Sequence, residues 1–188
     1  LTGLKWIANG ALARQAKGQR FLFGYEEALG YMVGDVVCCK DGMSAALHMA
    51  ELAAQCHAAG DTLLNRLNRI YQRHGFFLTA QRNLPVTGSL MQRLRQIPPT
   101  AIGQIRVSRI RDFLQESEFY SDVLMYELEN QARVIVRPSG TEPKVKCYYE
   151  ICMRVAGGDL DDTKRQASLA LQQLINAHQQ ALSLQISW

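Results

Sequence analysis

The sequence predicts two parts of different class, a helical region followed by an α+β unit with an antiparallel sheet. Two capped helical segments follow one another between residues 41 and 75. After a stretch broken by prolines, four runs alternate between apolar and polar residues as half-buried strands do. A long amphipathic helix comes last, and a run of strands followed by helices is typical of the α+β class.

The composition excludes several function classes. Hydrophobic residues make up 47% and charged residues 20% of the 188 residues, which is ordinary for a globular chain. The net charge of +4 comes from 21 basic and 17 acidic residues that are scattered along the chain, unlike the basic stripe of a nucleic-acid-binding protein. No apolar run is long enough to span a membrane. We therefore expect neither a nucleic acid nor a membrane as a partner.

The cysteines indicate a reducing compartment, and we expect a cytoplasmic protein. They are odd in number and lack paired CxxC spacing, which predicts neither a disulfide framework nor a zinc site. The chain begins with Leu1 rather than methionine, so we expect a fragment or a processed chain. The cysteines are Cys38, Cys39, Cys56, Cys147 and Cys152.

Two helices are predicted in the first part. Asp41 can cap the first, which Gly60 ends, and Asp61 can cap the second, which runs to Gly75. Apolar residues recur at helical spacing in both. They are Met43, Ala46, Leu47, Ala50, Ala53 and Ala54 in the first helix, and Leu63, Leu64, Leu67, Ile70 and Tyr71 in the second.

The second part is predicted to hold a sheet and a long helix. From Phe76 to Val86 the pattern is irregular, and a small helix lies around Leu90 to Ile97 between prolines. Asp159 to Asp162 introduce the last helix, which carries an apolar face. The expected strands are Ile105 to Ile110, Val123 to Glu129, Ala132 to Arg137 and Val145 to Met153. We place the first domain at residues 1–75, a linker and entry to the next domain at 76–100, and the second domain at 101–188.

The predicted hairpin loop with the sequence RPSGTEPK has the chemistry of an anion clamp. The Arg137 guanidinium can grip two phosphate oxygens, and the Ser139 and Thr141 hydroxyls can donate hydrogen bonds. Gly140 can take a positive φ, which would let backbone N–H groups converge on an anion. Serine, glycine, threonine and proline are also ordinary hairpin residues. Residue types alone leave both interpretations open.

The segment FGYEEALGY places two carboxylates, Glu26 and Glu27, between Gly24 and Gly30. One carboxylate can accept hydrogen bonds from two vicinal hydroxyls, the arrangement that a sugar presents. General acid–base work is a second interpretation, although paired glycosidase carboxylates normally face each other across a cleft. A third is the first turn of a helix, where acids favour the helix dipole.

The two loops, in this order, resemble the C-terminal half of the α-D-phosphohexomutase superfamily, the phosphoglucomutases and phosphomannomutases. RPSGTEPK looks like the phosphate-binding loop of that family's fourth domain, and GYEEALG looks like the sugar-recognition loop of its third. LTGLKWI is similar to a third-domain strand that carries a substrate-contacting lysine, here Lys5, and KDGMSAAL looks like the helix start after the sugar loop. The implied fold is an α/β remnant of the third domain followed by an α+β fourth domain, an antiparallel sheet with helices on one face.

The resemblance implies an enzyme that interconverts hexose 1-phosphate and 6-phosphate, with glucose as the expected sugar, through a phosphoserine and a hexose 1,6-bisphosphate. Mg²⁺, held by an aspartate loop, would stabilise the developing charge. This sequence contains neither the serine loop nor the aspartate loop. We therefore expect the chain to bind a phosphosugar without catalysing its conversion, with N-terminal domains of the same enzyme as partners. Phosphomannomutase, phosphopentomutase and a non-catalytic phosphosugar-binding module are the alternatives.

Carried over residue by residue, the resemblance makes Arg137, Ser139, Gly140 and Thr141 the clamp for the phosphate that is not transferred. It makes Glu26, Glu27 and Lys5 the contacts to the sugar, with Lys5 supporting the substrate's charge and with orientation of the loop as the alternative role of Glu27. Two positions depart from the family pattern. Ala28 stands where many relatives have a serine, which puts sugar preference in doubt, and Cys38 and Cys39 stand where charged residues are expected. For the scattered histidines His48, His57, His74 and His178 we expect neither metal binding nor catalysis.

Overall fold

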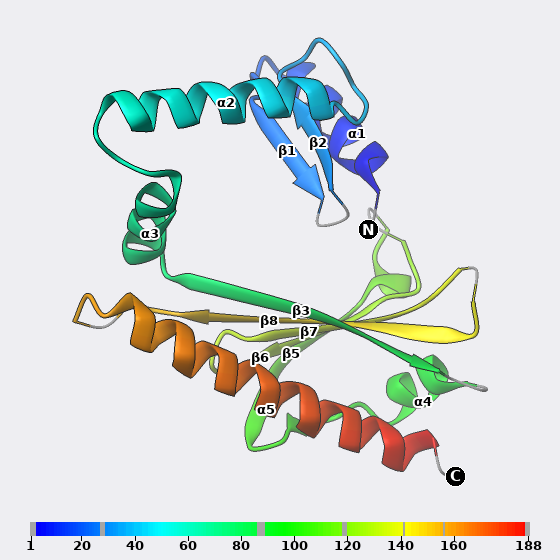
Figure 1. Cartoon of the computed structure of the whole chain (residues 1–188). Coiled ribbons are helices and arrows are strands. Elements are labelled where there is room, and N and C mark those ends of the chain that lie inside the picture. Colours follow the sequence, from blue (N-terminus) through cyan, green and yellow to red (C-terminus); the bar gives the residue numbers. More distant parts are fainter. Residues whose placement is uncertain are drawn as a thin grey trace. The chain divides into compact units, whose positions relative to one another are not determined.

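The computed structural model describes residues 3–26, 29–85, 89–117, 120–140, 142–155 and 157–186. The chain divides into two compact units, Leu1–Leu67 and Asn68–Trp188, each with its own elements (Figure 1). Helix α3 (Leu63–His74) crosses the division between the units.

The first unit holds a hairpin and two further helices. Strands β1 (Phe23–Glu26) and β2 (Gly30–Val33) pair antiparallel as a two-stranded sheet. Helix α1 (Leu4–Gln15) and helix α2 (Gly42–Ala58) complete the unit. Its small core contains Leu4, Ala8, Ala11 and Met32, with Ile7 and Phe21 packed against it.

The expectation that the first residues form a strand with Lys5 is wrong, because Lys5 lies in helix α1. Leu4, Ile7, Ala8 and Ala11 are spaced so that one helical face meets the hairpin. The approach is close at Gly24, where an added Cβ would stand 2.6 Å from the Cγ2 atom of Ile7. The helical period therefore accounts for this segment better than an alternation does.

The predicted start of α2 is confirmed, and that of α3 needs one correction. The Asp41 carboxylate accepts a hydrogen bond from the Ser44 backbone N–H at 2.9 Å, and hydrogen bonds from the side chain and the backbone of Ser44 lower the pKa of Asp41. At α3 the capping side chain is Thr62 rather than Asp61, since Thr62 Oγ1 accepts from the Asn65 N–H at 3.0 Å. Threonine at this position satisfies one of the unpaired N–H groups of the first turn.

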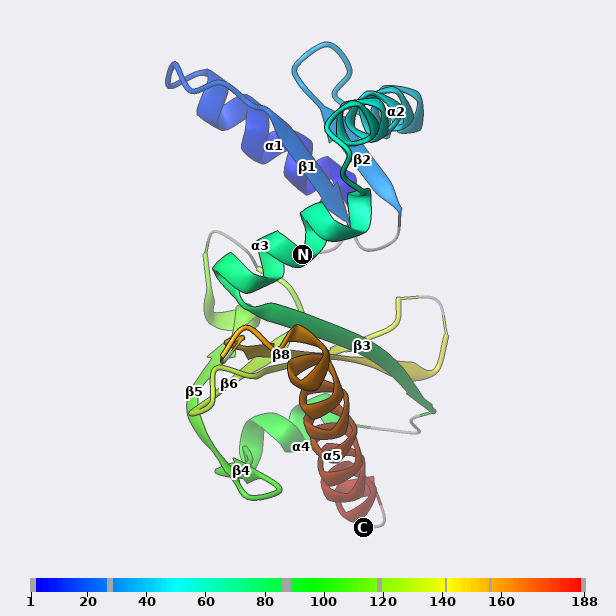
Figure 2. The same cartoon turned by 60° about the vertical axis from the view of Figure 1, so that its left-hand side comes forward.

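The second unit is an antiparallel sheet covered by helices on one face. The six strands follow the order β3-β8-β7-β6-β5-β4. Figures 1 and 2 show the long helix α5 and the short helix α4 on the same side of this sheet. The elements are β3 (Phe76–Pro85), α4 (Leu90–Gln96), β4 (Ala101–Ile102), β5 (Ile105–Asp112), the 3₁₀ turn η1 (Phe113–Gln115), β6 (Leu124–Leu128), β7 (Arg133–Pro138), β8 (Lys144–Met153) and α5 (Leu160–Ile186).

Alternation along the strands builds the core of this unit. In β8 the buried residues are Val145, Cys147, Tyr149 and Ile151, and the residues between them are only partly buried. Val134 and Val136 of β7 lie opposite Tyr149 and Cys147, and both are fully buried. Successive strand residues point to opposite faces, so one face of the sheet meets α4 and α5 and the other carries the polar residues.

Residues 76–100, which we expected to be a linker and the entry to the next domain, hold β3 and the expected short helix, α4. Strand β3 pairs with β8 over ten residues, from Phe76 opposite Met153 to Pro85 opposite Lys144. Leu78, Ala80 and Leu84 pack against the core from this edge strand. The pattern looked irregular because Arg82 occupies the apolar side of the alternation.

Candidate functional site

The predicted hairpin loop connects β7 to β8. The Ser139 N–H donates a hydrogen bond to the Lys144 carbonyl at 2.8 Å, which closes the loop. The Lys144 Nζ atom lies 2.5 Å from Oε2 of Glu142, and this hydrogen bond is the main cause of the lowered pKa of Glu142. The loop is thus held by its own backbone and one ion pair. Thr141 lies outside the described residues.

Gly140 does not have the positive φ that we expected of an anion-binding nest. Its place in the loop is nevertheless open, because no described heavy atom beyond its chain neighbours lies within 4 Å of where a Cβ would stand. Apart from its chain neighbours, no described side chain therefore blocks the approach of a ligand at this point.

Arg137 lies on the polar face of the sheet, directly opposite Lys146 in the register of β7 and β8. Cross-strand partners share a face and stand about 5 Å apart at Cβ, where two like charges are destabilising. Lys146 also acts on the loop, because its charge helps to lower the pKa of Glu142. The end of the hairpin therefore gathers Arg137, Lys144 and Lys146 with one carboxylate.

A hollow of about 420 Å³ lies between the hairpin and α4. Ser139, Glu142 and Lys144 line it from the hairpin, and Ser89, Gln92 and Arg95 line it from the α4 segment. Asp122 contributes from the segment before β6. Of the predicted clamp, the structure brings Ser139 to this hollow, whereas the described lining does not include Arg137.

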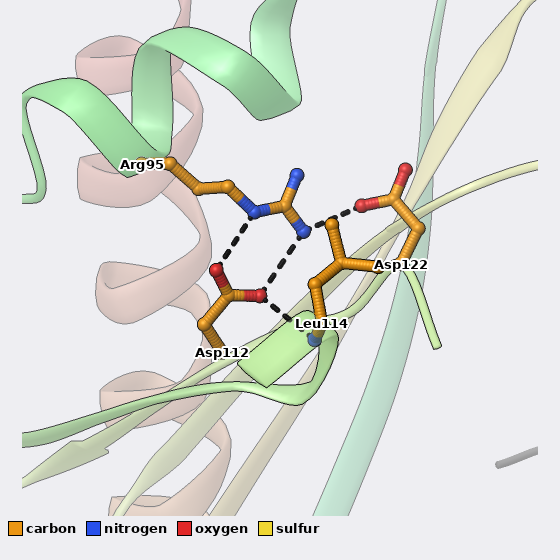
Figure 3. Close-up of polar contacts among 4 residues, drawn as sticks. All are labelled: Arg95, Asp112, Leu114 and Asp122. Atoms are coloured by element: carbon orange, nitrogen blue, oxygen red, sulfur yellow. Dashed lines mark hydrogen bonds and ion pairs between the residues drawn. The ribbon is translucent and has the colours of Figure 1, made fainter. Parts of the chain in front are cut away.

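Arg95 joins three segments at the wall of this hollow (Figure 3). Its Nε atom donates to Oδ2 of Asp112 at 2.9 Å and its Nη2 atom to Oδ1 at 3.2 Å, a bidentate pair. The same Nη2 atom donates to Oδ1 of Asp122 at 2.6 Å. The Asp112 carboxylate also accepts from the Leu114 N–H at 3.1 Å and so caps η1. We call Arg95, Asp112 and Asp122 the Arg95 network.

The pKa shifts in the Arg95 network follow from this pairing. Burial disfavours the charged form of Arg95, but the hydrogen bonds and charges of Asp112 and Asp122 outweigh this effect and raise the pKa of Arg95. Burial likewise opposes ionisation of Asp112, and the bonds from Arg95 and the Leu114 N–H outweigh it and lower the pKa of Asp112. Both the Arg95 guanidinium and the Asp112 carboxylate are therefore charged at neutral pH.

In the first unit, Glu26 stands at the end of β1 and pairs with a residue that the sequence did not point to. Its Oε1 atom lies 2.5 Å from Nζ of Lys40. Its side chain also lies over Gly30, where an added Cβ would meet Oε1 at 2.5 Å. Only glycine fits at position 30 with Glu26 in this place, which explains one of the two bracketing glycines.

The remaining predicted sugar contacts are Lys5 and Glu27. Lys5 is exposed on α1, and its Nζ atom lies 5.4 Å from the centroid of the Trp6 ring. Glu27 and Ala28 lie outside the described residues. The unusual pair Cys38 and Cys39 is exposed, and nothing in the structure explains it.

The described residues do not fit a metal ion. Among them, no group of three or more histidine, cysteine, aspartate or glutamate side chains could hold one. Of the two carboxylates that line the hairpin hollow, Asp122 is bonded to Arg95 and Glu142 is paired with Lys144. His178 is buried against Tyr149 rather than directed to a site, at 2.9 Å from the Tyr149 hydroxyl. Within the described part of the chain, no helix is both long and apolar enough to cross a membrane.

Two family models match the chain in succession. Residues 1–74 match the phosphoglucomutase/phosphomannomutase α/β/α domain III. Residues 106–164 match the phosphoglucomutase/phosphomannomutase C-terminal domain. The hairpin loop with Arg137 and Ser139 falls in the second match, and Glu26 and Lys40 fall in the first.

Curated relatives cover the chain more continuously. A probable phosphomannomutase of Haemophilus influenzae is 38% identical over 156 residues, which are 80% of this chain and 30% of the relative. The phosphopentomutase of Homo sapiens is 30% identical over 200 residues, which are 94% of this chain and 32% of the relative. The glucose 1,6-bisphosphate synthase of Homo sapiens is 28% identical over 186 residues, which are 87% and 29%. The chain thus spans about 30% of the length of these relatives.

Proposed function

Because this chain belongs to the phosphoglucomutase/phosphomannomutase family, of which it holds domain III and the C-terminal domain, we propose that it forms the phosphosugar-binding part of an intramolecular phosphotransferase. The observation that carries this proposal is the cross-strand pair of Arg137 and Lys146 beside the open hairpin loop. Two cations held in register on one face of a sheet both attract an anion that binds beside them.

Arg137, Ser139 and Gly140 would hold the phosphate that does not react, together with Thr141, which lies outside the described residues. A guanidinium donates two parallel hydrogen bonds to one phosphate, and the Ser139 hydroxyl adds a third. In a reaction through a bisphosphate, the sugar must bind in two orientations. One fixed anion site serves both orientations, because each presents one phosphate to it.

Glu26 would accept hydrogen bonds from sugar hydroxyls, with Glu27 and Lys5 as further contacts. At present Glu26 is bound by Lys40, and its side chain is 16% exposed. A sugar would therefore have to share or replace the Lys40 contact. A carboxylate has lone pairs for both partners, so Lys40 can orient Glu26 while hydroxyls bind its other oxygen.

The phosphoryl donor, the Mg²⁺ site and the remaining domains would come from another part of the same enzyme. Domain III has an α/β/α architecture, and such domains cover their sheet on both faces. In the first unit, large apolar side chains are exposed instead, among them Leu22 (66%), Met43 (87%) and Leu47 (69%). Apolar exposure of this extent supports packing against further protein, and we propose N-terminal domains of the enzyme as that protein.

Arg137→Ala should weaken the binding of glucose 1-phosphate about 10- to 100-fold, because a charge-assisted contact is worth roughly 1.5 to 3 kcal/mol. Isothermal titration calorimetry on the 188-residue chain measures this change directly. Arg133→Ala is a matched control, since Arg133 lies on the same strand and face, away from the hairpin loop, and is bonded to Glu150. Equal affinity of the wild type and the Arg137 variant would remove the clamp from the proposal.

The chain alone should not interconvert glucose 1-phosphate and glucose 6-phosphate, because it has no serine loop to donate the phosphoryl group. A coupled assay with Mg²⁺ and glucose 1,6-bisphosphate added tests this expectation. Turnover above background that co-purifies with the chain would contradict it and point to a donor within these residues.

Sugar preference separates the proposed glucose enzyme from its alternatives. The named relatives include a phosphomannomutase, a phosphopentomutase and a glucose 1,6-bisphosphate synthase. Glucose is the sugar we propose. Competition between glucose, mannose and ribose 1-phosphates in the same calorimetric experiment ranks the three.

A further inference from the structure

The Arg95 network lies at the wall of the same hollow as the hairpin loop that we propose to bind phosphate. Arg95 and Asp122 line the hollow together with Ser139 and Lys144. A hollow of about 420 Å³ is only about 9 Å across if roughly spherical, which is close to the distance over which salt screens charges, about 8 to 10 Å. Charges in the network therefore act on an anion at the hairpin.

The charge balance of the network matters for such an anion. Asp112 and Asp122 carry two negative charges, and Arg95 is bonded to both. Asp112 is drawn further toward its charged form by the Leu114 N–H. Without Arg95, two carboxylates would stand uncompensated beside a loop that must receive a phosphate.

Arg95 is also suited to hold α4 in place. Helix α4 has only seven residues, too few to be stable alone in water. The Arg95 guanidinium bonds to Asp112 and Asp122, which lie 17 and 27 residues further along the chain. Figure 3 shows these bonds leaving Nε and Nη2, while Nη1 is directed away from both carboxylates.

We infer that Arg95 is a positioning residue for phosphate binding, which, beyond any part it has in holding α4, masks the charges of Asp112 and Asp122 beside the hairpin. The inference rests on the proposed phosphate site. It assigns part of the hairpin's phosphate affinity to a side chain outside the hairpin. Arg95 also lies outside the match to the C-terminal domain, because that match begins at residue 106.

The charge of Arg95 can be separated from its bonds by substitution. Arg95→Met removes both, whereas Arg95→Lys keeps the charge and loses the fork that bonds two carboxylates. The double variant Arg95→Met with Asp122→Asn removes one of the two negative charges that Arg95→Met alone leaves uncompensated. A purely structural Arg95 predicts that the double variant binds as weakly as Arg95→Met, because the bridge to Asp112 is absent from both.

Calorimetry with glucose 1-phosphate should give an affinity about fivefold lower for Arg95→Met at low salt, as expected for a unit charge several ångströms away in a partly wet site. Arg95→Lys should stay within about twofold of the wild type, and Arg95→Met with Asp122→Asn should recover most of the loss. The deficit of Arg95→Met should shrink as salt is added. Thermal unfolding of each variant reports stability separately.

Three results would overturn the inference. Arg95→Met could bind as tightly as the wild type, Arg95→Lys could be as weak as Arg95→Met, or Asp122→Asn could fail to restore binding. Arg137→Ala in the same series separates the two proposals. If Arg137→Ala loses affinity and Arg95→Met does not, only the inference fails, whereas a wild type without measurable binding refutes both. If Arg95→Met does not fold, Arg95→Lys and the single variant Asp122→Asn test the inference. Arg95→Lys should then bind with near wild-type affinity, and Asp122→Asn should bind as tightly as the wild type or more tightly.

Discussion

Lowering the pH from 6.5 to about 4 should reduce the free energy of unfolding of the second unit by about 3 kcal/mol through His178 alone. His178 is only 2% exposed, and burial lowers its pKa from 6.5 to about 4. The unfolded chain takes up the proton at higher pH than the folded chain. The stabilisation is therefore complete above pH 6.5 and is lost as the pH falls toward 4.

The geometry around His178 explains why the folded state does not accept the proton. Its Nδ1 atom is hydrogen bonded to the Tyr149 hydroxyl at 2.9 Å, and its Nε2 atom has no hydrogen-bond partner among the described residues. Burial also raises the pKa of Tyr149, which keeps its hydroxyl neutral. No described carboxylate is bonded to the ring, so a charged imidazolium would be unpaired in the core.

Urea denaturation followed by circular dichroism above pH 6.5 and near pH 4 measures this loss. His178→Leu combined with Tyr149→Phe removes both polar groups and should flatten the pH dependence in this window. His74→Gln is the control, because His74 is exposed on α3 and should leave the dependence unchanged. A wild type equally stable at both pH values would contradict the assignment.

Local patterns predicted most of the second unit. Four strands and α5 follow from alternation and helical spacing, and the structure has them within a few residues of the expected bounds. β3 was not predicted, because an edge strand tolerates a charged residue such as Arg82 on its apolar side, where a central strand would not. α1 was not predicted, because LTGLKWI resembles a family strand and the helical spacing of Leu4, Ala8 and Ala11 is short.

Some residues of the candidate site could be predicted from a local pattern and others could not. Arg137 and Ser139 stand in one contiguous loop, so residue types within eight positions could indicate them. The opposition of Arg137 and Lys146 depends on hairpin register, which a sequence reveals only once both strand ends are known. Arg95 reaches Asp122 across 27 residues, and such a contact has no local pattern. The pair of Glu26 and Lys40 was not predicted either, because the two residues are 14 positions apart and belong to different segments.

Leu94→Ala should destabilise the second unit by about 2 to 5 kcal/mol, the range for a buried leucine that leaves a cavity. Leu94 is 1% exposed, and with Leu90 and Met91 it forms the apolar face that attaches α4 to the core. A helix of seven residues has little stability of its own, so the contact made by Leu94 is a large share of what keeps it folded. Chemical denaturation gives the loss, and Gln96→Ala, an exposed change in the same helix, should stay within about 0.5 kcal/mol of the wild type.

The same substitution should also weaken glucose 1-phosphate binding, because α4 carries Arg95 and lines the hollow beside Ser139. The link between the two effects distinguishes a docked α4 from an independent one. If Leu94→Ala destabilised the unit and left phosphate affinity at the wild-type value, α4 would be a stabilising element with no part in the site. If it left stability unchanged, α4 would not be packed as described. A loss of both, with Gln96→Ala unaffected, is expected if the core holds α4 and α4 in turn holds Arg95 at the wall of the phosphate site.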